Sequence, residues 1–559
     1  MKMSGSEILI KSLLKERVEV IFGYPGGANM PIYDALYDYG KQIRHILVRH
    51  EQGAAHAAEG YARITGKPGV CLVTSGPGAT NLVTGVADAM MDSVPMVAIT
   101  GQVAAEYLGS DAFQETDVMG ITTPITKWNC QVTHADEIVE TVAKAFYIAS
   151  HGRPGPVVID ITKNAQFEEA DFFYKKVVVK KLAFTNHFDD DEVRKAADLI
   201  NRSKRPILLV GHGVLISGAE KEIDELTRKG EIPAAATLHG LSVMSWSNPW
   251  FVGLTGMHGK YAPNVLTNEA DLVISAGMRF DDRVVGKMSE YAPLAKVIHV
   301  DVDASEHNKN IKADLPIVGD IKTFLKDLLP HINTGHRRSW REQFRILDKK
   351  EQTAEKKRLK KHRDDITMDE AIKTLSEKTN GQSIIVADVG QNQMFSARYY
   401  DFKKPNSFIT SGGLGTMGFA LPAAIGTAVG NPKRQTYVVV GDGGIQMTIQ
   451  ELGTIMQENL PIKILLLNNE FLGMVRQWQE LFFDKRYSFT NMTGPNYVDL
   501  AKAYGIKAKK ISKKINLRTA ISEFVESKES YLLEIKVAKE GNIFPMVPTG
   551  VAVDKVRLE

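Results

Sequence analysis

The chain has 559 residues, of which 43% are hydrophobic and 24% are charged, and its formal net charge is +3. This length exceeds what one hydrophobic core usually organises and predicts about three or four domains. The small net charge leaves no electrostatic footprint for nucleic acid or an anionic membrane, so we expect neither as a partner.

The amino terminus and the cysteines bear on the compartment. Ser4 and Glu7 have the spacing of a capping box that opens an amphipathic helix, and no continuous apolar run of a signal peptide precedes it. The two cysteines, Cys71 and Cys130, are too few for a disulfide framework. No stretch approaches the roughly eighteen apolar residues of a membrane span. We therefore expect a cytoplasmic protein.

The first third of the chain alternates β-rich runs with helical patterns, which predicts a doubly wound parallel sheet in an N-terminal domain over residues 1–170. Each predicted strand ends in a glycine-rich or polar turn, and such turns are the usual ligand-facing loops of this architecture. The predicted strands span residues 18–22, 45–48, 69–74, 96–100 and 157–161.

Two charged segments divide the remainder. Residues 166–190 are charged and irregular, which predicts a linker before a second α/β domain at 190–335, with strands at 206–210, 272–275 and 297–300. Basic and acidic residues are interleaved at 336–365, which predicts a solvated interdomain helix or linker rather than a nucleic-acid site. A third α/β domain follows at 366–559. The predicted fold class is thus α/β with three doubly wound parallel sheets, the first and third resembling two copies of one architecture.

The most informative stretch is 437–469, which indicates strand, helix and parallel strand. We expect apolar residues from Ile445 to Met456 to form one helix face. Asp442 and Asn469 would then lie at the carboxyl ends of two parallel strands, where a carboxylate and an amide oxygen suit Mg²⁺. Glycines 441, 443 and 444 allow close approach of backbone to an anion at a helix N-terminus. The residues predict a Mg²⁺-diphosphate site.

The spacing from Gly-Asp-Gly to Asn-Asn resembles that of thiamine-diphosphate enzymes. Gln450-Glu451-Leu452 and the segment 473–480 further resemble the catalytic large subunit of acetohydroxyacid synthase, also called acetolactate synthase. The resemblance implies an enzyme that decarboxylates pyruvate on thiamine diphosphate. The remaining two-carbon unit joins a second pyruvate to give 2-acetolactate, or 2-ketobutyrate to give 2-aceto-2-hydroxybutyrate. These products enter branched-chain amino acid biosynthesis.

In the third domain, the resemblance implies that Asp442, Asn469 and the backbone carbonyl of Phe471 bind Mg²⁺. Met417 would hold the cofactor in its bent form, and Gln391 and Asn392 would contact the diphosphate, although many relatives have histidine in place of Asn392. The other implied cofactor-binding residues are Val389, Gly390, Gly415, Gly443, Gly444, Gly473, Met474 and Val475.

In the first domain, Glu51 is an ordinary acidic first-turn residue when considered alone. The run from Arg49 to His56, however, resembles the element that supplies the activating glutamate of thiamine enzymes, which bonds the cofactor's aminopyrimidine ring. The same resemblance implies catalytic roles for Gln114 and Lys163 and substrate contacts from Gly27 and Phe113.

Motifs at 256–259, 277–283, 299–303 and 319–320 resemble the FAD-binding middle domain of the biosynthetic enzymes, in which FAD is chiefly structural. Arg283 and Trp478 would face the substrate. The implied FAD-binding residues are Arg153, Gly211, His212, Gly213, Gly256, His258, Arg279, Asp281, Asp301 and Asp320.

The resemblance also bears on partners. Because Glu51 and Asp442 lie in different domains, and the family builds each site between two subunits, a homodimer is the smallest unit expected to be competent. A small regulatory subunit is a further possible partner. Three alternatives stay open: an FAD-free catabolic acetolactate synthase, a pyruvate oxidase, and a noncatalytic diphosphate-binding scaffold. The arginine motif at 279–283 argues against the FAD-free enzyme. The lack of a terminal amphipathic anchor argues against the oxidase, and the presence of Glu51 argues against the scaffold.

Overall fold

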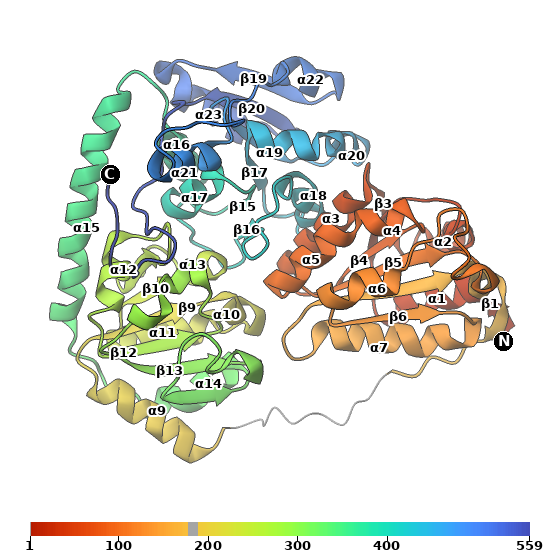
Figure 1. Ribbon diagram of the computed structural model, residues 1–559, viewed down its shortest axis with the longest axis horizontal. Coiled ribbons are helices and arrows are strands. Elements are labelled where there is room, and N and C mark those ends of the chain that lie inside the picture. Colours follow the sequence, from red (N-terminus) through yellow and green to blue (C-terminus); the bar gives the residue numbers. More distant parts are fainter. Residues whose placement is uncertain (1, 177–187) are drawn as a thin grey trace.

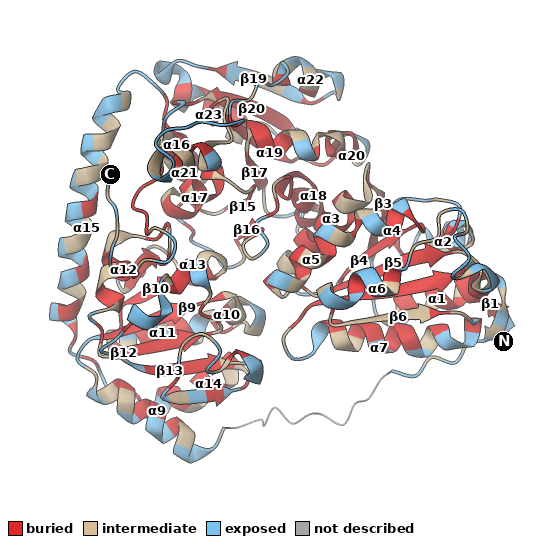
Figure 2. Ribbon diagram, in the orientation of Figure 1, coloured by how far each residue is buried: buried red, intermediate tan, exposed pale blue. Residues whose placement is uncertain are grey.

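The computed structural model describes residues 2–176 and 188–559, which form three six-stranded parallel sheets and a short antiparallel pair (Figure 1). Helices cover both faces of each large sheet. The inner strands of the large sheets are buried, as parallel sheets require, and exposed residues lie mainly on helices, loops and edge strands (Figure 2). The predicted fold class is confirmed. Among the described residues, no helix combines the length and apolar character that a bilayer crossing demands.

The N-terminal sheet has the order β3-β2-β4-β5-β7-β6. The edge strand β6 escaped prediction because Asn129 and Gln131 interrupt its apolar run. The strands are β2 (Val20–Gly23), β3 (Arg44–Leu47), β4 (Gly69–Val73), β5 (Met96–Gln102), β6 (Trp128–Val132) and β7 (Pro156–Thr162). The helices are α1 (Gly5–Lys15), α2 (Met30–Tyr39), α3 (Glu51–Thr65), α4 (Pro77–Asn81), α5 (Val83–Asp92), α6 (Val118–Thr122), α7 (Ile138–Ser150) and α8 (Lys163–Phe167).

The capping box at the start of α1 is confirmed. The backbone N–H of Glu7 donates to Ser4 Oγ at 3.3 Å, and the Ser4 N–H donates to Glu7 Oε2 at 3.1 Å. Just before it, β1 (Lys2–Ser4) pairs antiparallel with β8 (Glu169–Asp171). The expectation that the chain is irregular from residue 166 was therefore wrong at its start, because β1 offers a backbone partner distant in sequence. Residues 177–187 of that segment lie outside the described residues.

The central sheet has the order β11-β10-β9-β12-β13-β14. Counted within the domain, this is 3-2-1-4-5-6, the dinucleotide-binding arrangement, in which ligands bind where the order reverses between β9 and β12. The strands are β9 (Pro206–Val210), β10 (Ala234–Ala236), β11 (Phe251–Leu254), β12 (Leu272–Ala276), β13 (Lys296–Asp301) and β14 (Leu315–Val318). The helices are α9 (Asp190–Arg202), α10 (His212–Ser217), α11 (Glu220–Gly230), α12 (Tyr261–Thr267), α13 (Asp282–Val285) and α14 (Ile321–Leu328).

Within the charged segment 336–365, residues Arg338–Leu359 form the single helix α15, which runs along the outside of the central and C-terminal domains (Figure 1). Trp340 and Phe344 are buried against the central domain, and Trp340 Nε1 donates to the Pro206 carbonyl at 2.9 Å. Glu351 accepts from Arg398 of the C-terminal domain at 2.5 Å. The helix therefore ties two domains together.

The C-terminal sheet has the order β16-β15-β17-β18-β20-β19, which within the domain is 2-1-3-4-6-5, the same as in the N-terminal sheet. The strands are β15 (Ile384–Ala387), β16 (Phe408–Thr410), β17 (Thr436–Gly441), β18 (Lys463–Asn468), β19 (Lys507–Ile511) and β20 (Tyr531–Lys536). The helices are α16 (Met368–Thr379), α17 (Gln391–Tyr399), α18 (Ala420–Gly430), α19 (Asp442–Met447), α20 (Leu452–Gln457), α21 (Gly473–Phe482), α22 (Tyr497–Ala503) and α23 (Leu517–Glu526).

The helical stretch after Asp442 is broken, where the sequence predicted one continuous helix. Helix α19 ends at Met447, a 3-10 turn spans Ile449–Glu451, and α20 follows. Thr448 lies at the break and donates its hydroxyl to the Gly418 carbonyl at 2.8 Å, a contact that the periodicity could not reveal. As a result Met456, expected on the buried face, is 49% exposed.

Helices α3 and α18 join the N-terminal and C-terminal domains. A Cβ added to Gly60 would lie 1.9 Å from the Ala423 carbonyl oxygen, and one added to Gly426 would lie 1.7 Å from that of Ala57. The two backbones therefore approach more closely than any side chain permits. This contact fixes how the two similar sheets sit relative to each other within one chain.

Candidate active site

Asp442 and Asn469 lie next to each other at the carboxyl edge of the C-terminal sheet. Strands β17 and β18 pair in parallel with Gly441 opposite Leu467, so the residues that follow leave the sheet side by side. Gln391 opens α17 after β15, which flanks β17 on its other side. The sheet order reverses between β15 and β17, and open α/β sheets bind ligands at that point.

These loops enclose a cavity of about 50 Å³. Its walls require glycine at two positions. A Cβ on Gly444 would lie 2.4 Å from Asp388 Oδ1, and one on Gly473 would lie 2.3 Å from Gln391 Oε1. The predicted cofactor residues that line the cavity are Val389, Gly390, Gln391, Asn392, Met417, Asp442, Gly443, Gly444, Asn469, Phe471, Gly473, Met474 and Val475.

The polar groups of this cavity suit a hard cation. Burial raises the pKa of Asp442 to about 6, and a bound cation would favour its ionised form. The Asn469 amide is oriented by its neighbours, since Oδ1 accepts from the Phe471 N–H at 3.2 Å and Nδ2 donates to Gln391 Oε1 at 3.3 Å. A carboxylate and an amide oxygen at neighbouring strand ends fit Mg²⁺ with phosphate oxygens completing its shell.

Asn392 is placed differently from the expectation. Its side-chain amide donates to the backbone carbonyls of Asp388 at 2.7 Å and Val439 at 3.1 Å. Both amide hydrogens are therefore engaged with the sheet, and the side chain cannot donate to a phosphate in this arrangement. The side chain thereby ties the end of β15 to the end of β17.

A second cavity of about 730 Å³ opens at the switch point of the central sheet and is also lined by the other two domains. Its size is in the range of cofactor pockets. Val389, Gly390, Met417, Met474 and Val475 line both cavities, so the two are neighbours. The other predicted residues on its wall are Arg153, His212, Gly213, His258, Arg279, Asp281, Arg283, Asp301, Asp320, Gly415 and Trp478.

Gly211 and Gly256, both expected to contact FAD, are absent from this wall. A Cβ on Gly211 would lie 2.1 Å from the Gly277 carbonyl oxygen, so it allows two turns to meet. Gly256 has φ +94° and faces the Arg283 carbonyl. Both glycines lie behind the residues that line the cavity and allow close backbone contacts there. A sequence motif does not distinguish such a supporting glycine from one that contacts the ligand.

The charged residues of the larger cavity have local partners as well. Asp281 caps α13 by accepting from the Arg283 and Val284 N–H groups, and Asp320 caps α14 by accepting from Thr323. Arg153 pairs with Glu306 at 2.7 Å. The ring of His258 is buried, which lowers its pKa to about 3, and its Nδ1 has no hydrogen-bond partner in the described chain. A buried ring nitrogen without a partner on the wall fits a polar ligand.

Apart from Arg153, the five predicted residues of the N-terminal domain all follow carboxyl ends of its parallel strands. Glu51 begins α3, and its Oε2 accepts from Asn81 Nδ2 at 2.9 Å. Phe113 is 88% exposed. None of the five lines either of the two cavities described above. Within one chain, the structure gathers Gly27, Glu51, Phe113, Gln114 and Lys163 at a separate sheet edge.

Several polar residues at these sites carried no sequence signal. Asp388 accepts from the N–H groups of Gly418 and Ala420, 30 and 32 residues away, and so holds the loop that carries Met417. Asn81 orients Glu51. Both are isolated polar residues in the sequence. Asp388 directly follows a strand, and that position is the one signal that could have drawn attention to it.

Comparisons with known families agree with the division of the chain into three domains. Residues 3–121 match "Thiamine pyrophosphate enzyme, N-terminal TPP binding domain" and residues 193–328 match the "central domain" of the same family. Residues 388–535 match its "C-terminal TPP binding domain". The N-terminal and C-terminal matches cover the sheet edges that carry Glu51 and Asp442.

Individual relatives are similar over nearly the whole chain. The Acetolactate synthase isozyme 2 large subunit of Escherichia coli is 43% identical over 98% of this chain and 98% of its own length. The Probable acetolactate synthase large subunit of Methanocaldococcus jannaschii is 44% identical over 98% and 94%. The Acetolactate synthase large subunit of Lactococcus lactis is 43% identical over 99% and 96%. The chain therefore belongs to the acetolactate synthase large-subunit family of thiamine pyrophosphate enzymes.

Proposed function

We propose that this chain is the catalytic subunit of an acetolactate synthase, which decarboxylates pyruvate and ligates the two-carbon unit to a second 2-keto acid. The observation that carries the proposal is the pairing of two chemistries on two similar sheets. Asp442 and Asn469 line a buried cavity at one edge whose groups suit a metal and a diphosphate, and Glu51 is oriented by Asn81 at the other edge. A thiamine cofactor has a diphosphate end and a pyrimidine end that require these two kinds of group.

The C-terminal edge would hold the diphosphate. Asp442, Asn469 and the carbonyl of Phe471 would bind Mg²⁺, and the glycine backbone at 443–444 would meet the phosphate oxygens at the start of α19. Met417, which lines both cavities, would support the bend of the cofactor. These residues fix where the reacting end of the cofactor enters the larger cavity.

Glu51 would bond the pyrimidine ring and favour the tautomer that removes a proton from the cofactor. Thiamine diphosphate, when bound, supplies the carbon nucleophile that accepts a 2-keto acid, allows its carboxylate to leave as CO₂ and transfers what remains. Arg283, whose side chain is 59% exposed at the cavity wall, would attract the carboxylate of the incoming keto acid. Trp478 and Phe113 would shape the apolar side of the pocket, with Gln114, Lys163 and Gly27 beside them.

The active unit would be a homodimer. The predicted pyrimidine-side residues line neither cavity of their own chain, which supports an arrangement in which a second copy would supply Glu51 to the cavity around Asp442. Burial of Phe113 and of Tyr37, each 88% exposed in the single chain, is consistent with such an interface. Because the relatives are named large subunits, we extend the proposal to association with a smaller regulatory subunit.

The larger cavity would hold FAD in a structural role. Supporting observations are the 3-2-1-4-5-6 sheet order, a cavity of about 730 Å³ at its switch point, and the buried unpaired Nδ1 of His258. Arg153, Arg279 and the turn at His212 and Gly213 would meet the diphosphate of FAD, while Asp301 or Asp320 would accept ribose hydroxyls.

One assay tests the proposal. Purified protein with thiamine diphosphate, Mg²⁺ and FAD is given pyruvate with and without 2-ketobutyrate, and CO₂, products and flavin content are measured. We expect CO₂ release with 2-acetolactate, 2-aceto-2-hydroxybutyrate when the second acid is present, and one FAD per chain. Full activity without bound flavin would instead identify the FAD-free catabolic type. Bleaching of the flavin by pyruvate at the turnover rate would identify an oxidase, and absence of CO₂ release would identify a scaffold.

A further inference from the structure

The loop at 411–418, between β16 and α18, determines where Met417 stands. Gly415 and Gly418 on either side of Met417 have φ of +77° and +88°, so the chain turns sharply before and after it. Most of the loop lines the larger cavity, and Met417 also lines the smaller one. Whatever fixes this loop therefore fixes the support beneath the cofactor.

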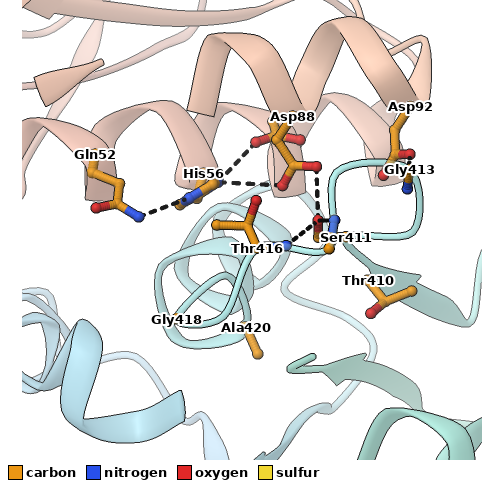
Figure 3. Close-up of polar contacts among 12 residues, drawn as sticks. Gln52, His56, Asp88, Asp92, Thr410, Ser411, Gly413, Thr416, Gly418 and Ala420 are labelled. Carbon is orange, nitrogen blue, oxygen red and sulfur yellow. Dashed lines mark hydrogen bonds and ion pairs between the residues drawn. The ribbon is translucent and has the colours of Figure 1, made fainter. Parts of the chain in front are cut away.

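The first half of the loop is held by the N-terminal domain, beginning with Asp88 on α5 (Figure 3). Ser411 Oγ donates to Asp88 Oδ1 at 2.8 Å. The same hydroxyl accepts from the N–H groups of Gly415 at 3.0 Å and Thr416 at 2.8 Å. Both side chains are completely buried. Asp88 thus orients the hydroxyl that closes the turn immediately before Met417.

Asp92, one helical turn further along α5, holds the next two residues. Its carboxylate accepts from the N–H groups of Gly412 at 3.0 Å and Gly413 at 2.7 Å. Arg63 Nη2 lies 2.8 Å away, and His239 Nε2 of the central domain lies 3.0 Å away. One carboxylate therefore joins all three domains at the base of the loop.

The two carboxyl groups are in different charge states. Burial, together with the nearby Glu59 and Asp92, raises the pKa of Asp88 to about 8, so it is protonated at neutral pH. Burial acts on Asp92 in the same sense, but His239 and Arg63 outweigh it and hold the pKa of Asp92 well below its usual range. Asp88 therefore serves as a neutral partner and Asp92 as an anion.

The helices that carry these residues also bring His56 and Glu59 close to Asp88. His56 Nδ1 lies 2.8 Å from Glu59 Oε1 and 3.9 Å from Asp88 Oδ2. The guanidinium of Arg63 lies 3.5 Å from Glu59. Since a cation is already built into the cluster, its groups serve as a rigid base for Asp88 rather than as a metal site.

The second half of the loop is held from its own domain. Asp388, at the end of β15, accepts from Gly418 at 3.1 Å and from Ala420 at 3.0 Å. Met417 therefore stands between two anchors that belong to different domains. The Asp388 anchor fixes the loop to the diphosphate cradle, and the Asp88 and Asp92 anchors fix it to the domain that carries Glu51.

We propose that Asp88 and Asp92 are positioning residues for the thiamine cofactor, which act on it through the loop at 411–418 and not by direct contact. The proposal rests on the proposed function, because Met417 has a cofactor to support only if the cradle binds thiamine diphosphate. Loss of either anchor should let the loop relax and remove the support for the bent cofactor, while the metal and diphosphate groups stay in place.

The test compares two probes of the same cradle. Affinity for thiamine diphosphate with Mg²⁺ is measured by tryptophan fluorescence, and affinity for Mg²⁺ with inorganic pyrophosphate is measured by competition. Asp92→Asn and Ser411→Ala should each weaken thiamine diphosphate binding about tenfold, as loss of a buried charged or loop-closing hydrogen bond implies. Pyrophosphate affinity should change by less than about twofold, and kcat should fall more than KM for pyruvate changes. Asp198→Asn, at an exposed carboxylate on α9, is the control and should leave every value unchanged.

A pair of substitutions at Asp88 separates positioning from packing. Asp88→Asn keeps an oxygen that accepts from Ser411 and should retain wild-type affinity, whereas the similarly sized Asp88→Leu should lose it. Equal behaviour of the two variants, or a parallel loss of both probes in Asp92→Asn, would overturn the proposal. If Asp92→Asn fails to fold, Ser411→Ala alone decides. A wild-type protein that binds no thiamine diphosphate would refute the proposed function instead, which is a different result.

Discussion

The N-terminal and C-terminal sheets have the same strand order, yet the loops at their carboxyl edges carry different chemistry. The C-terminal edge encloses a small cavity lined by glycines, Asp442 and Asn469, suited to a metal and phosphates. The N-terminal edge presents Glu51 and the exposed Phe113, and neither residue lines that cavity. The shared fold supplies the placement of loops at one edge, and the loop residues supply the function.

The comparison also explains why both sheets are needed. A single edge offers either a cation site or an oriented carboxyl group, and a thiamine cofactor needs both at opposite ends. The contact between α3 and α18 fixes the two sheets within one chain, but it leaves the two edges apart. Under the proposed function, association of two chains would bring the two edges together.

The largest expected effect comes from the C-terminal edge. Asp442→Ala would remove the proposed charged metal ligand, so cofactor affinity should fall on the order of a hundredfold or more and turnover should be lost. Isothermal titration with Mg²⁺ and thiamine diphosphate measures this. Unchanged binding would show that the cradle holds its ligand without this carboxylate.

The matching change at the N-terminal edge should separate binding from turnover. Glu51→Gln keeps the size of the side chain but cannot favour the reactive tautomer, so turnover should fall about a hundredfold or more with binding changed only slightly. Steady-state kinetics and titration on the same preparation measure both. Turnover near the wild-type value would remove the activating role.

Mixing the Asp442→Ala and Glu51→Gln variants tests whether one active site combines Glu51 of one chain with Asp442 of another. If each site takes Glu51 from one chain and Asp442 from the other, half of the dimers are hybrids and each has one intact site. Dissociation and reassociation of equal amounts should then restore about a quarter of wild-type activity. No recovery, despite hybrid dimers detected with two different tags, would place each site within one chain.

The buried acids behind the N-terminal edge predict a pH effect on stability. Burial raises the pKa of Asp88 to about 8, so the folded state binds a proton that the unfolded chain releases near pH 4. Folded stability should therefore fall as pH rises from about 4 to about 8, by at most about 1.4 kcal/mol per pH unit for this group. Asp88→Asn removes this slope, so the difference in Tm between variant and wild type should grow with pH. A constant difference would mean that Asp88 is ionised throughout.

The smallest effect concerns the helix contact that joins the two sheets. Gly426→Ala places a methyl group 1.7 Å from the Ala57 carbonyl oxygen and should cost about 1–3 kcal/mol of stability through overpacking. Gly40→Ala is the control, because its nearest neighbour would be 3.6 Å away. Denaturant unfolding measures both. Equal stabilities would show that α3 and α18 can separate slightly without loss.

The sequence alone determined the features that depend on local pattern. Apolar runs that end in polar or glycine turns predicted most of the inner strands of the sheets. Asp442 and Asn469 each follow such a run, so it was predictable that they lie together at one sheet edge. The capping box at Ser4 and Glu7 was equally local. Residue type and spacing suffice wherever partners lie within one turn or at the ends of neighbouring strands.

Tertiary structure decided what depends on distant partners. The broken helix after Asp442 follows from a contact between Thr448 and Gly418, and the edge strand β6 forms because β7 offers it a ladder. The bond between Asp88 and Ser411 spans 323 residues. The separation of Glu51 from both cavities depends on the close crossing of α3 and α18. The hydrophobic periodicity of a segment shows which of its faces is buried. It does not show which other segment covers that face, because the pairing of segments is decided when the whole chain packs.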